Sequence, residues 1–173
     1  MNKTRFVISA VAVVIIAIGV FLVDPDCSRF SDVTVRGDSM AGILSHGDVA
    51  SLHSRYYSCH EPARGDLAMI EYRGNPAPIV KQVRGLPGDH LTFAKDSYAT
   101  YLILNRQPLT TTRNEFFYVD ESAKKLLSLY LDSNANIKGG TYLLLGNQPV
   151  GSIDSRDFGL LGKRQFLGRI FKK

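Results

Sequence analysis

Residues 78–89 read PIVKQVRGLPGD, an aliphatic run that ends in a turn. The β-branched residues favour a strand through Arg84, and the Leu-Pro-Gly-Asp that follows has the composition of a turn. Side chains alternate between the two faces of a strand, so Lys81 shares a face with Ile79 and Val83. The stretch therefore predicts β structure with a lysine on the more apolar face.

Similar short runs recur along the chain and predict a mainly β, antiparallel domain. Clusters of Gly, Pro, Asp and Asn separate them, as in an all-β sandwich or barrel. We expect strands at 33–35, 49–52, 67–72, 79–84, 90–93, 101–104, 116–119, 142–145 and 166–171. One segment differs, because residues 121–131 place their leucines on one helical face and predict a short helix. The 173 residues, 45% of them hydrophobic, suit a single domain with a real core.

The N-terminus predicts a membrane anchor. Residues 6–23 carry no charge, and these 18 residues are just enough to cross a bilayer as a helix. The rival interpretation is a cleaved signal peptide, but the run does not end in a small-x-small site. Lys3 and Arg5 precede the run, so residues 1–5 are expected in the cytoplasm. The protein is then single-pass in the inner or plasma membrane, with residues 24–173 as an extracytoplasmic β domain.

Charge and cysteine content narrow the function classes. The net charge is +5, and much of the basic charge lies at the two ends of the chain. Such ends favour solvated or membrane-surface charge over nucleic-acid binding, since no basic stretch is interleaved with aromatics. No cysteine or histidine spacing is typical of a zinc site. Cys27 and Cys59 are the only cysteines, and either a disulfide or two buried thiols fits the sequence.

A nucleophile and its base are the sharpest hypothesis that the residues carry. Gly37-Asp38-Ser39-Met40 follows a strand-like run, and Ser39 is the candidate nucleophile. A lysine among aliphatic side chains has a lowered pKa, and its neutral amine can serve as a general base. Taken alone, an ordinary turn at Ser39 and a Lys81 that snorkels into water are the simpler interpretations. No G-x-S-x-G elbow offers a Ser-His-Asp alternative.

The order of motifs along nearly the whole chain resembles the type I signal peptidases, membrane-anchored Ser/Lys proteases. The similar motifs are Gly37-Asp38-Ser39-Met40, Arg64-Gly65-Asp66-Leu67-Ala68, residues 81–89, residues 104–109, and Gly146-Asn147 followed by residues 152–159. Each motif alone is weak, whereas five in the right order after an anchor are strong. The resemblance implies coiled antiparallel β-sheets behind one transmembrane helix.

The resemblance also implies roles for the first motif. Ser39 would attack the scissile carbonyl and Lys81 would take its proton. Some relatives place an oxyanion-binding serine two residues before the nucleophile, where this chain has Gly37. A backbone N–H, most simply that of Ser39, would then stabilise the oxyanion.

The C-terminal motif supplies supporting residues. Ser152 matches a family serine thought to hydrogen-bond and orient the lysine. Asp154 and Arg156 match a supporting pair. On an extended segment, residues i and i+2 share a face, so a salt bridge between these two is expected. We expect at least half of the role of Arg156 to be structural.

The implied substrates are exported precursor proteins with small residues at positions −1 and −3, bound extended beside a strand edge at the lipid bilayer. No metal or cofactor is implied. Gly42 replaces a usual proline, and Asn147-Gln148-Pro149-Val150 replaces a usual Asp-Asn-Arg-Asp. These departures leave open a specialised conjugative-transfer or pilin signal peptidase. A membrane-anchored β domain that only binds exported chains is the non-enzyme alternative. A self-cleaving repressor relative is disfavoured by the anchor and by the lack of a helix-turn-helix.

Overall fold

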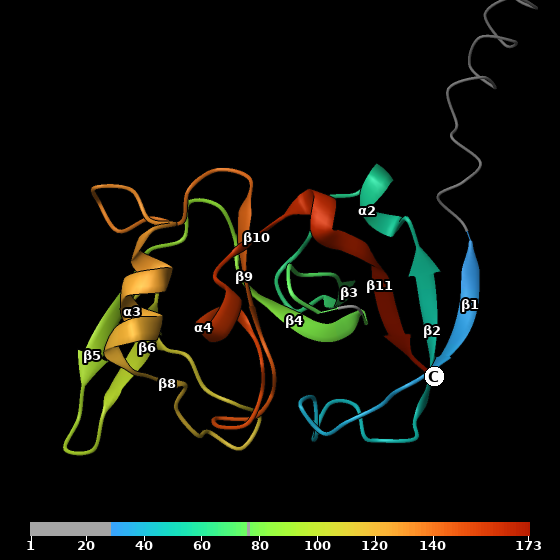
Figure 1. Ribbon diagram of the computed structural model, residues 1–173, viewed down its shortest axis with the longest axis horizontal. Helices are drawn as coiled ribbons and strands as arrows, with labels where there is room; N and C mark the ends of the chain where they lie inside the picture. The colour runs from blue at the N-terminus through green and yellow to red at the C-terminus, as the bar shows by residue number, and fades with distance from the viewer. Residues whose placement is uncertain (1–28, 76) are drawn as a thin grey trace, which may run out of the picture.

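The computed structural model describes residues 29–75 and 77–173 (Figure 1). In chain order the elements are β1 (Phe30–Thr34), β2 (Val49–Ser54), α2 (Tyr56–Cys59), β3 (Leu67–Ile70), β4 (Ile79–Gly85), β5 (Leu91–Lys95), β6 (Thr100–Leu104), β7 (Gln107–Pro108), β8 (Tyr118–Val119), α3 (Glu121–Ser128), β9 (Thr141–Leu145), α4 (Ser155–Phe158), β10 (Leu161–Gly162), the 3-10 turn η2 (Lys163–Gln165) and β11 (Phe166–Lys172). Each of the nine expected β runs overlaps a strand. The two-residue strands β7 and β10 are additional to them.

The larger sheet has the order β1-β2-β11-β3-β4-β9-β10, with every pair antiparallel. Its curved strands extend from β1 on the right of Figure 1 to β9 and β10 near the middle. Strand β4 lies inside this sheet, and its buried residues alternate along the strand as Lys81, Val83 and Gly85. The alternation read from the sequence is therefore confirmed, and it points Lys81 into the protein.

The smaller sheet has the order β5-β6-β7, with β8 also paired to β6. Helix α3 packs beside it, on the left of Figure 1. Strand β9 joins the cores of the two sheets, because Leu143 and Leu145 belong to the core of the smaller sheet and Leu144 to that of the larger one. A strand buried on both faces reads as a continuous apolar run, as TYLLL does here.

The antiparallel, mainly β prediction is confirmed, but a single sandwich or barrel is not what forms. The larger sheet stays open within the described residues, with β1 and β10 at its edges. The expected helix is shorter than 121–131: it starts after Asp120, whose side chain accepts from Ala123 N at 2.7 Å, and ends at Ser128.

The predicted anchor at 6–23 and the cytoplasmic residues 1–5 lie outside the described residues. Within residues 29–75 and 77–173, no helix is long and apolar enough to cross a membrane. Cys59 is disulfide-bonded, and the chain's other cysteine, Cys27, lies outside the described residues. The thiol interpretation of Cys59 is therefore wrong.

Candidate active site

Ser39 lies on a tight turn that closes on itself. At its base Val35 O accepts from Gly47 N at 2.9 Å, and Leu44 N donates to Met40 O at 2.8 Å within the turn. Met40 and Leu44 are buried, so they fasten the turn to the core formed with β1, β2 and β11. This packing holds the backbone around Ser39 while its side chain stays partly exposed.

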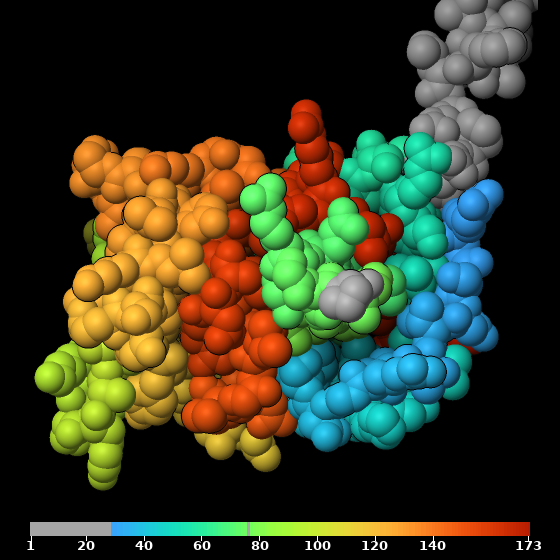
Figure 2. Space-filling view, in the orientation of Figure 1, coloured from blue at the N-terminus to red at the C-terminus, as the bar shows by residue number. Residues whose placement is uncertain are grey.

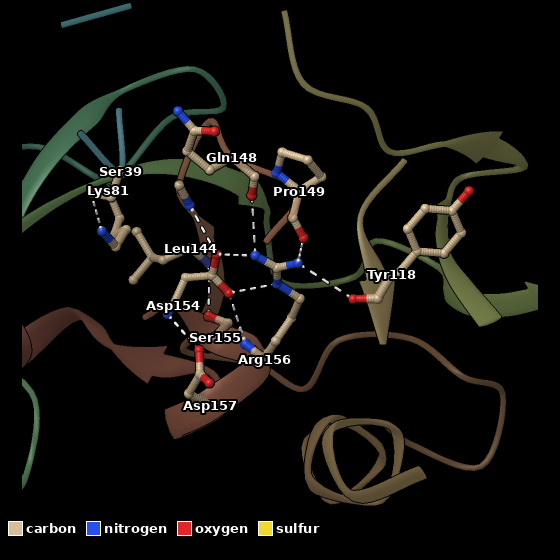
Figure 3. A network of polar contacts seen from close by, with 11 residues as sticks. Ser39, Lys81, Tyr118, Leu144, Gln148, Pro149, Asp154, Ser155, Arg156 and Asp157 are labelled. Carbon is tan, nitrogen blue, oxygen red and sulfur yellow. Dashed lines mark hydrogen bonds and ion pairs between the residues drawn. The ribbon is translucent and has the colours of Figure 1, made fainter. Parts of the chain in front are cut away.

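Lys81 meets that turn from β4. Its Nζ donates to Ser39 Oγ at 2.7 Å, although only 2% of the lysine is exposed (Figure 3). Burial lowers the pKa of Lys81 to about 8, against the opposing field of Asp154 and Asp157. The predicted proximity and lowered pKa are both present, and a substantial share of the amine is neutral in mildly alkaline solution.

A cavity of about 190 Å³ opens onto the two side chains. One wall is residues 33–37, which continue from β1, and the other is residues 78–81 at the start of β4. Met40, Met69 and Ile170 add apolar side chains. A hydroxyl and a buried amine at the end of an apolar cavity can act together as nucleophile and general base.

Two backbone groups near Ser39 differ in availability. Gly37 N donates to His46 Nδ1 at 3.1 Å, so this N–H already has an acceptor. The N–H of Ser39 makes no hydrogen bond within the described residues, while Ser39 O accepts from Asn147 N at 2.7 Å. Of the two N–H groups, that of Ser39 is the one available to an incoming oxygen.

The predicted hydrogen bond from Ser152 to Lys81 is wrong for this structure. Ser152 is buried, and its Oγ has no hydrogen-bond partner among the described residues. The hydroxyl lies instead against Gly146, where an added Cβ would come within 2.1 Å of it. The Lys81 amine meanwhile makes its hydrogen bond to Ser39.

The predicted pair of Asp154 and Arg156 forms a bidentate salt bridge (Figure 3). Arg156 Nε donates to Asp154 Oδ1 and Nη2 to Oδ2, both at 2.9 Å, and Asp154 is fully buried. The reason given from an extended segment is wrong, however. Asp154 is the N-cap of α4, in a capping box with Asp157, and the helical turn brings Arg156 back onto it.

Arg156 also holds the preceding loop. Its guanidinium donates to Pro149 O at 2.6 Å and to Gln148 O and Tyr118 O at 3.3 Å each. The carboxylate of Asp154 in turn accepts from Gly146 N at 3.1 Å. The expected structural role of Arg156 thus has a definite form, which is to fix residues 146–150 beside Ser39.

Asn147 is a supporting residue for which the sequence suggested no role. Its Nδ2 donates to Ala41 O and to Thr112 Oγ1, each at 2.7 Å, and Thr112 N donates back to Oδ1 at 3.0 Å. Gly42 has φ +89°, and a Cβ there would meet Asn147 Nδ2 and Thr112 Oγ1 at 3.0 Å. Proline cannot adopt that φ. Gly42 and Asn147, which both depart from the family pattern, therefore lie close together in space.

No group of three or more His, Cys, Asp or Glu side chains is placed to hold a metal ion in residues 29–75 and 77–173.

The known proteins to which this chain is similar are signal peptidases. The family model described as signal peptidase, peptidase S26, matches residues 3–172. Signal peptidase IB of Staphylococcus aureus strain Mu50 is 26% identical over 174 residues, covering 94% of this chain and 83% of the relative. Signal peptidase I of Bacillus caldolyticus is 25% identical over 150 residues, covering 82% and 77%. A crystal structure of a signal peptidase I from Enterococcus faecalis V583 has a TM-score of 0.43 and 24% identity, covering 64% of this chain and 97% of that one.

Proposed function

The chain belongs to the signal peptidase family, peptidase S26, and we propose that it removes N-terminal signal peptides from exported precursors with Ser39 as nucleophile and Lys81 as base. The observation that carries the proposal is the 2.7 Å contact between a buried lysine amine and a cavity-facing serine hydroxyl. The lowered pKa of Lys81, about 8, supports the role of base.

Acylation follows from this geometry. Ser39 Oγ attacks the carbonyl carbon of the scissile peptide as its proton passes to Lys81 Nζ. The N–H of Ser39, which has no acceptor among the described residues, donates to the oxyanion, and the hydrogen bond from Asn147 N to Ser39 O holds this peptide segment. The carbon–nitrogen bond then breaks, and Lys81 returns the proton to the leaving amine, which is the new N-terminus of the mature protein.

Deacylation uses the same groups. Lys81 takes a proton from a water molecule, whose oxygen attacks the ester carbon of the acylated serine. The ester bond to Ser39 Oγ breaks, the proton moves to that oxygen, and the signal peptide leaves with a new carboxylate. The same amine thus acts as base and acid in both halves of the reaction.

The substrate would bind extended in the cavity. Residues 79–81 pair with β3 on one side only, because β9 pairs with β4 from Gln82 onward. Strand β1, at the rim of the sheet, likewise pairs on one side only within residues 29–75 and 77–173. Two free edges on the cavity walls suit an added strand, and the small cavity suits small side chains at positions −1 and −3.

The proposed location follows from the sequence. Residues 6–23 would anchor the enzyme in the lipid bilayer, with residues 1–5 in the cytoplasm and residues 24–173 outside it. Tethering would raise the effective concentration of enzyme toward precursors that the same membrane holds.

A specialised substrate set is the second candidate within the family. Gly42 and Asn147 replace residues usual in the family, and a Cβ added to Gly42 would meet Asn147 Nδ2 at 3.0 Å. This joint change keeps a specialised enzyme, such as a conjugative-transfer or pilin signal peptidase, as the second candidate. The non-enzyme alternative, a domain that only binds exported chains, has no use for the buried amine against Ser39.

The test is cleavage of a purified precursor whose signal ends in Ala-x-Ala by the full chain in detergent. Mass determination should find a product that begins directly after that motif. An intact precursor after prolonged incubation at pH 9 would reject the enzymatic proposal. Cleavage of a pilin precursor alone would favour the specialised substrate set.

A further inference from the structure

A second and larger hollow lies near the site. It has a volume of about 720 Å³ and runs between α3 and the loop of residues 149–152. Tyr118 and Arg156 line it, and in Figure 3 they lie beyond Asp154 as seen from Ser39 and Lys81. We call it the α3 groove. The proposed reaction uses none of its exposed surface.

One segment of chain links the α3 groove to the active site. Gln148 Nε2 donates to Asp38 O at 3.2 Å, next to the nucleophile, and the following residues, Pro149 and Val150, form a groove wall. Figure 2 shows the Ser39 turn in blue, this segment in red-orange and α3 in orange-yellow, next to one another across one face.

Ser152 belongs to the groove and also packs close to the site. It lines the α3 groove, and its Oγ faces Gly146. A Cβ on Gly146 would lie 2.1 Å from Ser152 Oγ and 2.7 Å from Ser39 O, so both groups pack against Gly146. Ser152 Oγ is buried and has no partner in the described residues, so a substrate in the groove would contact the exposed lining and not this hydroxyl.

The lining has the character of a peptide-binding surface. Val150 is 77% exposed, and Leu126 and Ala99 add apolar surface on the opposite wall. The remaining charges at the groove are negative, because Asp120 and Asp157 are exposed there and, among the described residues, accept only backbone N–H groups, from Ala123 and Asp154. The positive charge of Arg156 is taken up by Asp154 and by backbone carbonyls.

We propose that the α3 groove binds the substrate segment that follows the scissile bond, and that it prefers neutral or basic side chains over acidic ones. The inference rests on the proposed function, since it extends the same substrate past Ser39. The cavity of about 190 Å³ takes the residues before the bond, and the chain then crosses the Ser39 turn onto Pro149 and Val150. Six extended residues span roughly 20 Å, enough to follow such a groove.

The test compares two peptides that share an Ala-x-Ala signal end. The short one stops one residue after the scissile bond, and the long one continues for six. For the full chain in detergent, kcat/KM should be about tenfold higher for the long peptide. Ser122→Trp fills the groove from α3 and should bring the ratio of long to short close to one. Ser128→Trp, on the same helix but away from the groove, should keep the wild-type ratio.

Charge gives a second readout. A lysine in the fourth position after the bond should be cut faster than a glutamate there, and raised salt should shrink the difference. If the short peptide is cut but length, charge and Ser122→Trp change nothing, the groove has no role in substrate binding. If neither peptide is cut, the proposed function itself fails. An equal loss of the ratio in both tryptophan variants would also overturn the groove.

Discussion

Lys81 Nζ and Ser39 Oγ are 2.7 Å apart, although 42 residues of chain separate them. The lysine belongs to a regular strand inside the larger sheet, whereas the serine lies on a turn held by its own hydrogen bonds. The rigid element carries the group whose pKa must be set by burial. The turn, held by Met40 and Leu44, presents the group that must reach the substrate.

Ser39→Ala should abolish precursor cleavage and leave the fold intact. The change removes the nucleophilic oxygen, and a partly exposed hydroxyl contributes at most about 1 kcal/mol to the free energy of unfolding. Mass determination of the product and thermal unfolding of the same preparation check both halves. Ser45→Ala, a change in an exposed residue of the same loop, is the matched control. Turnover near the wild-type rate in the Ser39 variant would contradict the assignment.

Lys81→Arg should also be inactive. Arginine keeps the positive charge but does not deprotonate at usable pH, so it cannot accept the serine proton. The measurement is single-turnover cleavage from pH 7 to pH 10. Lys95→Arg, an exposed residue at the end of β5, should behave as the wild type. An active Lys81→Arg protein would show that Lys81 contributes only its positive charge.

The sequence predicted the features that depend on residues close together in the chain. Alternation in β4 placed Lys81 on the face of Val83, and that face is buried. The residues suggested Ser39 as its partner only as a hypothesis, and the family resemblance then strengthened it. Their distance depends on the turn of residues 37–44 and on β3-β4 pairing, which involve contacts far apart in sequence that no local pattern encodes.

The misses have different origins. Asp154 was assigned to an extended segment, although Asp154 and Asp157 have the spacing of a capping box that starts a helical turn. Asn147 acts through Ala41 and Thr112, which lie far from it in the chain. The direction of the Ser152 hydroxyl is a matter of one rotamer and could not be read from sequence.

Asp154→Asn should destabilise the domain by about 3 kcal/mol, because it leaves the buried Arg156 charge unpaired. Urea unfolding of the full chain in detergent measures this free energy. Arg113 and Glu115 form an exposed pair, so Glu115→Gln should change stability by less than about 1 kcal/mol. Equal effects of the two variants would mean that burial of the Asp154 pair has no energetic weight.

Gly42→Ala should reduce kcat/KM at least tenfold. A Cβ there would press on Asn147 and Thr112 at 3.0 Å, and the positive φ disfavours any side chain, so the Ser39 turn must shift. Gly140→Ala is the matched control, because Gly140 also has a positive φ but open space around its Cα. It should lose about 1 kcal/mol of stability and keep its activity. Full activity of Gly42→Ala would show that the turn tolerates displacement.

The pH profile tests the state of Lys81 directly. Burial lowers the lysine pKa to about 8, and the neutral amine is the active form. Activity should therefore rise with pH, with the midpoint of log kcat/KM near 8 and not near the ordinary lysine value of about 10.4. Val83→Thr adds a hydroxyl on the face that Lys81 shares with Val83, which eases the burial of charge and should move the midpoint upward. Ile103→Thr, a similar change on β6 away from the site, should leave the midpoint in place while allowing a change in maximal rate. A wild-type midpoint below pH 6, or one that ignores the Val83 change, would identify a histidine or a carboxylate as the base.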